Sequence, residues 1–161
     1  PNYCEQVTYF KKLFIDACKI RMRNDVPTAS CLSGGLDSSS VFCSIMKIKE
    51  TVVPTEEVPE NSHIGFVASY MNDIDNEVEY AKEVITHTKS TAYYFEIDQC
   101  NLLNEYFDII YSYENISDIH IGPWLLFKKM RDLGIYVSID GHGGDELLAG
   151  YPQYIILYCR L

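Results

Sequence analysis

A single glycine-rich segment, SGGLDSS at residues 33–39, constrains the fold of this chain more than any other feature. It follows a short apolar run, TASCL at residues 28–32. It precedes residues whose helical spacing predicts a buried helix face: Val41, Phe42, Ile45, Met46 and Ile48. A strand that turns sharply through two glycines into a helix is typical of α/β proteins. In such folds, ligands bind at the carboxyl ends of parallel strands.

The rest of the chain continues this alternation of strands and helices. Apolar spacing predicts helices over residues 4–22, 76–88, 102–110 and 123–132, and strands over residues 63–69, 91–97 and 135–139. Prolines and glutamates predict an exposed loop over residues 51–62. This order predicts an α/β fold, a parallel β-sheet with helices on both faces. A second glycine-rich turn, at residues 141–144, follows the last strand, so both turns should lie at one edge of the sheet.

Composition restricts the partners of the chain. The 161 residues carry a net charge of −10, spread along the sequence, which disfavours general nucleic-acid binding. No apolar run approaches the roughly 18 residues of a membrane span, and no signal-peptide pattern occurs, so we expect a cytoplasmic protein. The six cysteines form no C-x-x-C pair, which favours reduced thiols over a zinc cluster. We expect residues 1–161 to form one domain that is part of a longer chain.

The first glycine-rich turn has the properties of a phosphate site. Its glycines allow close approach of the backbone, and the amide groups at the start of the next helix point toward an anion. It is not a Walker A loop, because no lysine follows before Lys47. Asp37 would repel phosphates unless a cation lay between them, which favours a role as a Mg²⁺ ligand. The alternative is a structural turn in which Asp37 and Ser38 cap the helix.

Three motifs together resemble one enzyme family. SGGLDSS is similar to the pyrophosphate loop of N-type ATP-pyrophosphatases. The preceding RMRNDVP, residues 21–27, resembles the lead-in of the asparagine synthetase family, and DGHGGDELLAGY, residues 140–151, resembles its second motif. The resemblance covers nearly the whole chain. It implies that the chain corresponds to the C-terminal synthetase domain of that family. It also implies the fold of that domain, the adenine nucleotide α-hydrolase-like fold of the PP-loop ATP-pyrophosphatases.

The resemblance also implies a reaction and its residues. In this family ATP is cleaved between its α and β phosphates to give an acyl-adenylate and pyrophosphate. Asp37 and Asp145 are the implied Mg²⁺ ligands, and Asp145 and His142 the implied catalytic residues. Two carboxylates that converge on one sheet edge are consistent with a cation between them. The residues implied to bind ATP and pyrophosphate are Cys31, Leu32, Ser33, Gly34, Gly35, Asp37, Ser38, Ser39, Ala68, Asp140 and Gly141.

Other residues of the second motif have less specific interpretations. Glu146 either supports the neighbouring Asp145 or caps the following helix. Gly150 and Tyr151 are interpreted as architectural.

His142 departs from the family pattern, which has glutamate at this position, near the reacting carboxyl and the incoming ammonia. A histidine can accept a proton near neutral pH, so it can replace that glutamate as a base. It can equally indicate a different amine or acyl partner, as in relatives that close β-lactam or lasso-peptide rings. The third interpretation is a polar loop residue without a chemical role.

The family implies further partners. The leading interpretation is asparagine formation from aspartate, with ammonia supplied by a glutaminase domain elsewhere in the protein or in trans. The alternatives are amide or lactam formation on a peptide or specialised metabolite, and a non-catalytic nucleotide-binding relative. The lysine that steadies phosphate charge in this family lies well beyond the second motif.

We therefore expect residues 1–161 alone to show little turnover, because part of the implied phosphate site is missing. ATP–pyrophosphate exchange, measured on this chain with aspartate, should stay near background. Robust exchange would contradict the interpretation.

Overall fold

The computed structural model describes residues 2–51, 63–70, 77–97, 102–116 and 121–160. The chain order of its elements is α1 (Tyr3–Arg21), β1 (Thr28–Cys31), α2 (Leu36–Thr51), β2 (His63–Tyr70), α3 (Glu77–Thr88), β3 (Ala92–Ile97), α4 (Leu102–Tyr113), α5 (Ile121–Asp132), β4 (Val137–Ser138), α6 (Gly144–Leu148) and α7 (Pro152–Tyr158). The predicted elements are confirmed, with bounds that differ by one or two residues at most ends. Residues 52–62 of the predicted loop, Asn76 and Cys100 lie outside the described residues.

The four strands form one parallel sheet in the order β3-β2-β1-β4. From β1 the chain adds β2 and then β3 on one side. It then crosses back through α4 and α5 to place β4 on the other side of β1. The strand order therefore reverses between β1 and β4, which is where open α/β sheets bind ligands. Both glycine-rich turns follow these two adjacent strands.

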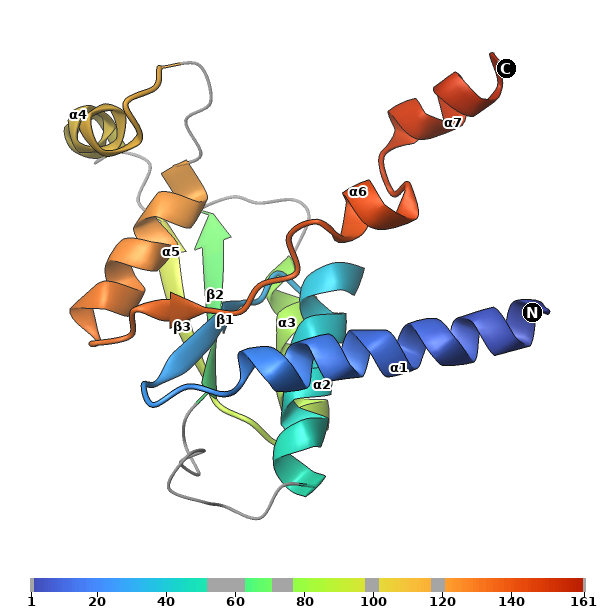
Figure 1. Cartoon of the computed structure of the whole chain (residues 1–161). Helices are drawn as coiled ribbons and strands as arrows, with labels where there is room; N and C mark the ends of the chain where they lie inside the picture. Colours follow the sequence, from blue (N-terminus) through green and yellow to red (C-terminus); the bar gives the residue numbers. More distant parts are fainter. Residues whose placement is uncertain (1, 52–62, 71–76, 98–101, 117–120, 161) are drawn as a thin grey trace.

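Helices cover both faces of the sheet, as predicted (Figure 1). On one face α2 and α3 pack against a buried cluster built from Leu32, Val67 and Ile139 of the sheet side and Phe42 and Ile45 of α2. On the other face α5 packs through Met130 onto Ala29 and Phe66. The alternation of side chains along each strand assigns its residues to one cluster or the other.

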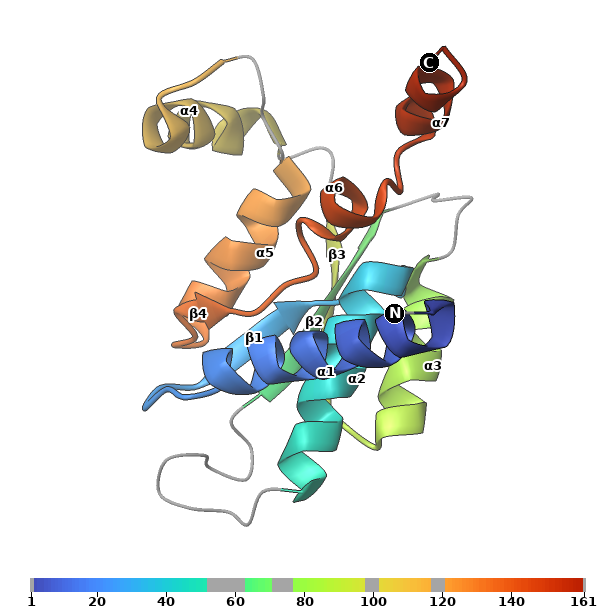
Figure 2. The ribbon, with the colours of Figure 1, turned by 45° about the vertical axis from the view of Figure 1, so that its right-hand side comes forward.

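The outer helices α1, α6 and α7 are only partly covered by the rest of the described structure. Only the C-terminal half of α1 packs closely on α2, where Cys18 is buried, whereas Val7, Phe10 and Leu13 stay exposed. The helices α6 and α7 extend from the body beyond the sheet edge (Figure 2). The apolar side chains of α7 are largely exposed.

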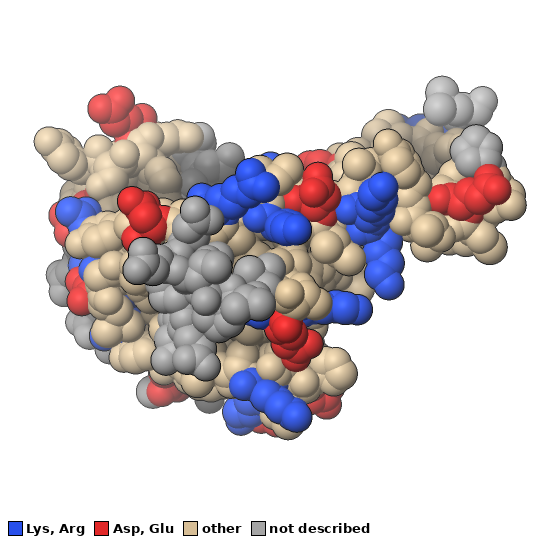
Figure 3. All heavy atoms as spheres, turned by 60° about the horizontal axis from the view of Figure 1, so that its bottom comes forward, with Lys and Arg blue, Asp and Glu red and all other residues tan. Residues whose placement is uncertain are grey.

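Charged side chains of both signs are interspersed over the face in Figure 3, without a single-sign block. This distribution agrees with the even spread of charge along the sequence. Among the described residues, no helix has the length and apolar character needed to cross a membrane.

Three polar side chains, those of Thr28, Ser30 and His63, are buried in the part of the chain that the structure describes. The imidazole of His63, at the start of β2, is only 4% exposed and lies against the ring of Phe42. Its Nδ1 is 2.8 Å from Thr28 Oγ1 and its Nε2 is 2.9 Å from Ser30 Oγ. Because the Ser30 hydroxyl donates its proton to the carbonyl of Ile139, Nε2 must be the protonated nitrogen that donates to Ser30. Burial, with a smaller contribution from Lys49, lowers the pKa of His63 to about 3.

This buried imidazole predicts a loss of stability in mild acid. Above its ordinary pKa of 6.5, His63 is neutral in both the folded and unfolded states and adds no pH dependence. Below that pH the unfolded chain binds a proton that the folded chain does not, which lowers the free energy of unfolding by about 2 kcal/mol near pH 5. The free energy of unfolding, measured with urea at pH 7 and pH 5, should fall less between the two pH values in His63→Gln than in the unsubstituted chain. His87→Gln, at an exposed site, is the control, and an unchanged difference in His63→Gln would contradict the prediction.

Candidate functional site

The first glycine-rich turn is held in shape by its own serines. The hydroxyl of Ser33 lies 3.0 Å from that of Ser38 and accepts the amide N–H of Gly35 at 3.1 Å. The hydroxyl of Ser38 also lies 3.2 Å from the carbonyl of Gly35. Gly34 has a φ of +83°, and a Cβ there would overlap the start of α3 at Tyr80. The turn therefore requires glycine at position 34, both for its backbone conformation and for its contact with α3.

The second turn packs directly against the first. A Cβ on Gly141 would lie 2.7 Å from the backbone carbon of Asp37 and 2.7 Å from the amide nitrogen of Ser38. A Cβ on Gly144 would overlap the carboxylate of Asp37. These glycines let the backbones of two segments, about a hundred positions apart in the sequence, come into contact at the edge of the sheet.

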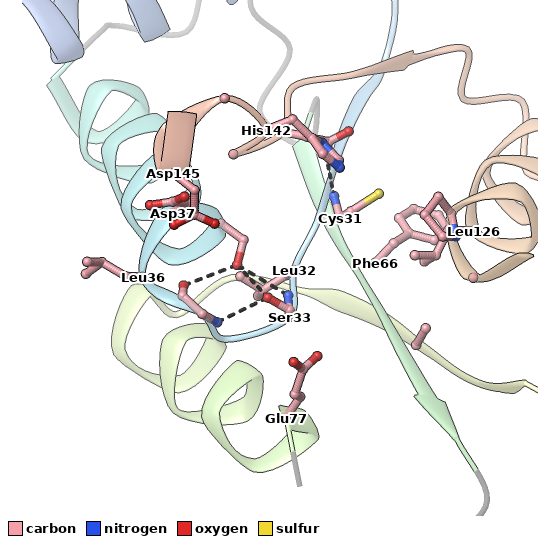
Figure 4. Close-up of a pocket in the computed structure, with 18 of the residues that line it drawn as sticks. Cys31, Leu32, Ser33, Leu36, Asp37, Phe66, Glu77, Leu126, His142 and Asp145 are labelled. Carbon is pink, nitrogen blue, oxygen red and sulfur yellow. Dashed lines mark hydrogen bonds between the residues drawn. The ribbon is translucent and has the colours of Figure 1, made fainter. Parts of the chain in front are cut away.

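This contact brings Asp37 and Asp145 together on one wall of a cavity of about 510 Å³ (Figure 4). Asp37 lies in the first turn of α2, and its carboxylate lies against Gly144, the residue that precedes Asp145. Among the described residues, neither carboxylate accepts a hydrogen bond or forms an ion pair. The predicted convergence of the two aspartates is therefore observed.

The donor set suits a hard divalent cation. Mg²⁺ is commonly held by one or two protein carboxylates, with water and substrate phosphates completing its octahedral shell. Within the described parts of the chain, no group of three or more histidine, cysteine or acidic side chains could enclose a metal. The pair Asp37 and Asp145 therefore fits Mg²⁺ that is shared with a phosphate ligand better than a metal bound by protein alone.

Asp140 has a different environment from the two aspartates. One of its oxygens accepts the amide N–H of Cys31 at 2.7 Å and the hydroxyl of Ser138 at 2.8 Å. It thereby ties β1 to β4 and fixes the start of the second turn. Burial, followed by the charge and hydrogen bond of Asp140, raises the pKa of the Cys31 thiol to about 12. This thiol is a neutral part of the cavity wall.

Glu146 lies in the first turn of α6 and bonds to Tyr151, a partner that neither interpretation of Glu146 named. It accepts a 2.8 Å hydrogen bond from the hydroxyl of Tyr151, and both side chains line the cavity. This bond is the main reason that the pKa of Glu146 is lowered and that of Tyr151 is raised to about 12. The interpretation of Tyr151 as architectural misses its position on the cavity wall.

Most of the residues that the sequence implicates line this one cavity. Gly34 and Ser39 are not among the residues that line the cavity. Gly34 packs against Tyr80 of α3, and the hydroxyl of Ser39 is buried without a hydrogen-bond partner among the described residues. Those that do are Cys31, Leu32, Ser33, Gly35, Asp37, Ser38, Ala68, Asp140, Gly141, His142, Asp145 and Glu146.

Sequence reasoning missed the apolar half of the cavity. Phe66 of β2 and the first turns of α5 form it, and Glu77 of α3 also lines the cavity, below Ser33 in the view of Figure 4. Phe66 could have been found, because it lies in a predicted strand two residues before Ala68, which the sequence implicates. Gly122, Pro123 and Leu126 carry no such signal, since only the packing of α5 on the sheet brings them to the cavity.

The model of one protein family, described as asparagine synthase, matches residues 9–160. The chain belongs to the asparagine synthase family. A putative glutamine-hydrolysing asparagine synthetase of Methanocaldococcus jannaschii is 33% identical over 153 residues, which covers 90% of this chain and 26% of that protein. The amidase chyE of Penicillium rubens is 30% identical over 156 residues, covering 93% of this chain and 23% of that protein. This family member thus spans about a quarter of the length of these relatives.

Solved structures confirm the fold of this asparagine synthase family member. The NH3-dependent NAD synthetase of Campylobacter jejuni superposes with a TM-score of 0.54 at 16% identity, covering 89% of this chain and 60% of that one. The glutamine-dependent NAD+ synthetase of Acinetobacter baumannii, in complex with ADP, gives the same TM-score at 17% identity, covering 86% of this chain and 26% of that one. The predicted PP-loop, adenine nucleotide α-hydrolase-like fold is confirmed.

The contact between the two turns predicts the effect of a single methyl group. Gly141→Ala would force its Cβ into the backbone of Asp37 and Ser38, which cannot yield as a side chain can. We expect the free energy of unfolding to fall by about 1–3 kcal/mol, as for overpacking elsewhere, in denaturant titrations. Gly35→Ala is the control, because its Cβ would meet no backbone atom and only the hydroxyl of Ser33, at 3.2 Å. Equal stability of the two variants would show that the turns do not depend on this contact.

Proposed function

We propose that this chain binds Mg-ATP and, within its full-length protein, activates a carboxylate by adenylation so that an amine can form an amide. The observation that carries the proposal is the pair Asp37 and Asp145, two carboxylates that receive no hydrogen bond from the described residues, on the wall of a cavity built by two glycine-rich turns. The asparagine synthase family membership supports the same conclusion.

The cavity offers different surroundings to the two ends of a nucleotide. The apolar half, formed by Phe66, Pro123 and Leu126, suits a nucleobase. The turn at residues 33–39 suits the phosphates, since Ser33 and Ser38 provide hydroxyls and the start of α2 provides amide groups. The amide groups of Cys31 and Leu32 are already bonded to Asp140 and to the carbonyl of Phe66, so their carbonyls are the groups left to read the base.

In the first step, a carboxylate oxygen of the substrate attacks the α-phosphorus of ATP. The bond from that phosphorus to the bridging oxygen of the β-phosphate breaks, and pyrophosphate leaves. Mg²⁺ bound by Asp37 and Asp145 would neutralise negative charge that develops on the phosphates. The backbone of the first turn holds the leaving group in place, and its rigid hydrogen bonds reduce the reorganisation needed at the transition state.

In the second step, an amine attacks the acyl carbon and AMP leaves. The attacking nitrogen must lose a proton to become an amide. His142 lines the cavity on the second turn and is the side chain that we assign to accept this proton.

Aspartate is the first acyl substrate to consider, with ammonia as the amine and a glutaminase domain as its source. The named asparagine synthetases among the relatives support this choice. A second candidate is amide formation on another acid, since His142 replaces the usual glutamate and an amidase from Penicillium is as similar to this chain as many asparagine synthetases are. A non-catalytic nucleotide-binding protein leaves the two aspartates without explanation.

The proposal predicts that both aspartates are needed for turnover. In the full-length protein, Asp37→Asn and Asp145→Asn should each lower the rate of substrate-dependent pyrophosphate release at least about a hundredfold, because charge on the phosphates is no longer neutralised. The assay screens aspartate first and then other carboxylic acids, and thermal unfolding verifies that each variant is folded. Asp16→Asn, on the exposed side of α1, is the control.

The outcome separates the candidates. Release with aspartate supports asparagine formation, and release only with another acid supports the second candidate. Mg-ATP binding without release for any acid would indicate a nucleotide-binding protein. Near-normal turnover of either aspartate variant would show that the metal assignment is wrong.

A further inference from the structure

We propose that Gly150 and Tyr151 are positioning residues for the carboxylate of Asp145. This inference rests on the proposed function, because it concerns how the chain prepares one of its two Mg²⁺ ligands. It extends the family resemblance, in which these two residues have only an architectural interpretation.

The chain turns back on Asp145 immediately after α6. The amide groups of Ala149 and Gly150 both donate to the carbonyl of Asp145, the second at 2.9 Å. Ala149 adopts the left-handed conformation, with φ of 56° and ψ of 41°, which ends the helix and reverses the chain. The backbone of Gly150 is thereby brought beside the side chain of the residue that begins the turn.

Gly150 provides the space that the carboxylate of Asp145 occupies. A Cβ at position 150 would overlap Oδ1 of Asp145 and would lie 2.9 Å from its Cγ. The φ of Gly150 lies outside the left-handed range, so an alanine could adopt this backbone conformation. The carboxylate is therefore the reason for glycine at this position, and any larger residue must displace it.

Tyr151 closes the same turn from the other side. Its hydroxyl donates to Glu146 at 2.8 Å, which links the start of α7 to the first turn of α6. The bond engages the carboxylate that directly follows Asp145 in the sequence. Both carboxylates line the cavity, and Asp145, beside Asp37, is the one of this pair that accepts no hydrogen bond from the described residues (Figure 4).

The arrangement gives the two residues distinct effects. Gly150 fixes where the Asp145 carboxylate lies, and Tyr151 keeps the neighbouring Glu146 from competing for the cation and holds the turn closed. A metal site needs its ligands held within a few tenths of an ångström, so both contacts should act on cation affinity.

The test measures cation binding directly. Mn²⁺ is titrated into the full-length protein in the presence of an ATP analogue with a methylene bridge between its α and β phosphates, and free Mn²⁺ is followed by electron paramagnetic resonance. We expect Gly150→Ala to weaken Mn²⁺ binding about tenfold or more and Tyr151→Phe about threefold. The Mg²⁺ concentration for half-maximal pyrophosphate release should rise in both variants, and more in Gly150→Ala than in Tyr151→Phe.

Matched controls separate positioning from general damage. Gly134→Ala introduces a methyl group at a left-handed glycine with open space around it, so it should lower stability without changing Mn²⁺ affinity. Tyr154→Phe removes a hydroxyl from a ring that packs against Tyr151, and it should leave the affinity unchanged. Thermal unfolding verifies the folded state, and Tyr151→Phe alone decides the test if Gly150→Ala does not fold.

Two failures can be told apart. If Asp37→Asn and Asp145→Asn weaken Mn²⁺ binding but Gly150→Ala and Tyr151→Phe stay within twofold of the unsubstituted protein, the positioning role is wrong. If the two aspartate variants themselves bind Mn²⁺ normally, the metal site of the proposed function is wrong, and this inference is overturned with it.

Discussion

The contact between the two glycine-rich turns is the constraint on which the rest of the site depends. Gly141 lies against the backbone of Asp37 and Ser38, and Gly144 lies against the carboxylate of Asp37. No side chain fits between the turns, so their separation is set by backbone contact. This separation determines that Asp37 and Asp145 share one cavity wall.

The cavity concentrates acidic side chains in a protein that is already acidic, and the structure treats them differently. The carboxylate of Asp140 accepts hydrogen bonds from Cys31 and Ser138, and that of Glu146 accepts one from the hydroxyl of Tyr151. Asp37 and Asp145 receive no such donors among the described residues. The repulsion between two unpaired carboxylates is relieved by a cation, so the distribution of hydrogen bonds itself distinguishes the candidate metal ligands from the structural aspartate.

Side-chain hydrogen bonds also hold the sheet together beside the site. β4 is short, and it pairs with β1 over only Thr28 and Ala29. Hydrogen bonds from side chains supplement this pairing, since Asp140 accepts the amide of Cys31 and Ser30 donates to the carbonyl of Ile139. The second turn is therefore anchored to β1 by polar side chains at the point where the ladder ends.

The sequence alone determined the alternation of strands and helices, the two turns, and the aspartates of the site. These features depend on local patterns, namely apolar periodicity and glycines that only tight turns require. Tertiary structure decided that β4 lies beside β1, that α5 supplies Pro123 and Leu126, and that Tyr151 bonds Glu146. Strand order and helix placement arise from the packing of distant segments, and local spacing carries no information about which distant segments pack together. The exposed half of α1 illustrates this limit. Its apolar residues have the spacing of a buried helix face, but no described segment covers them.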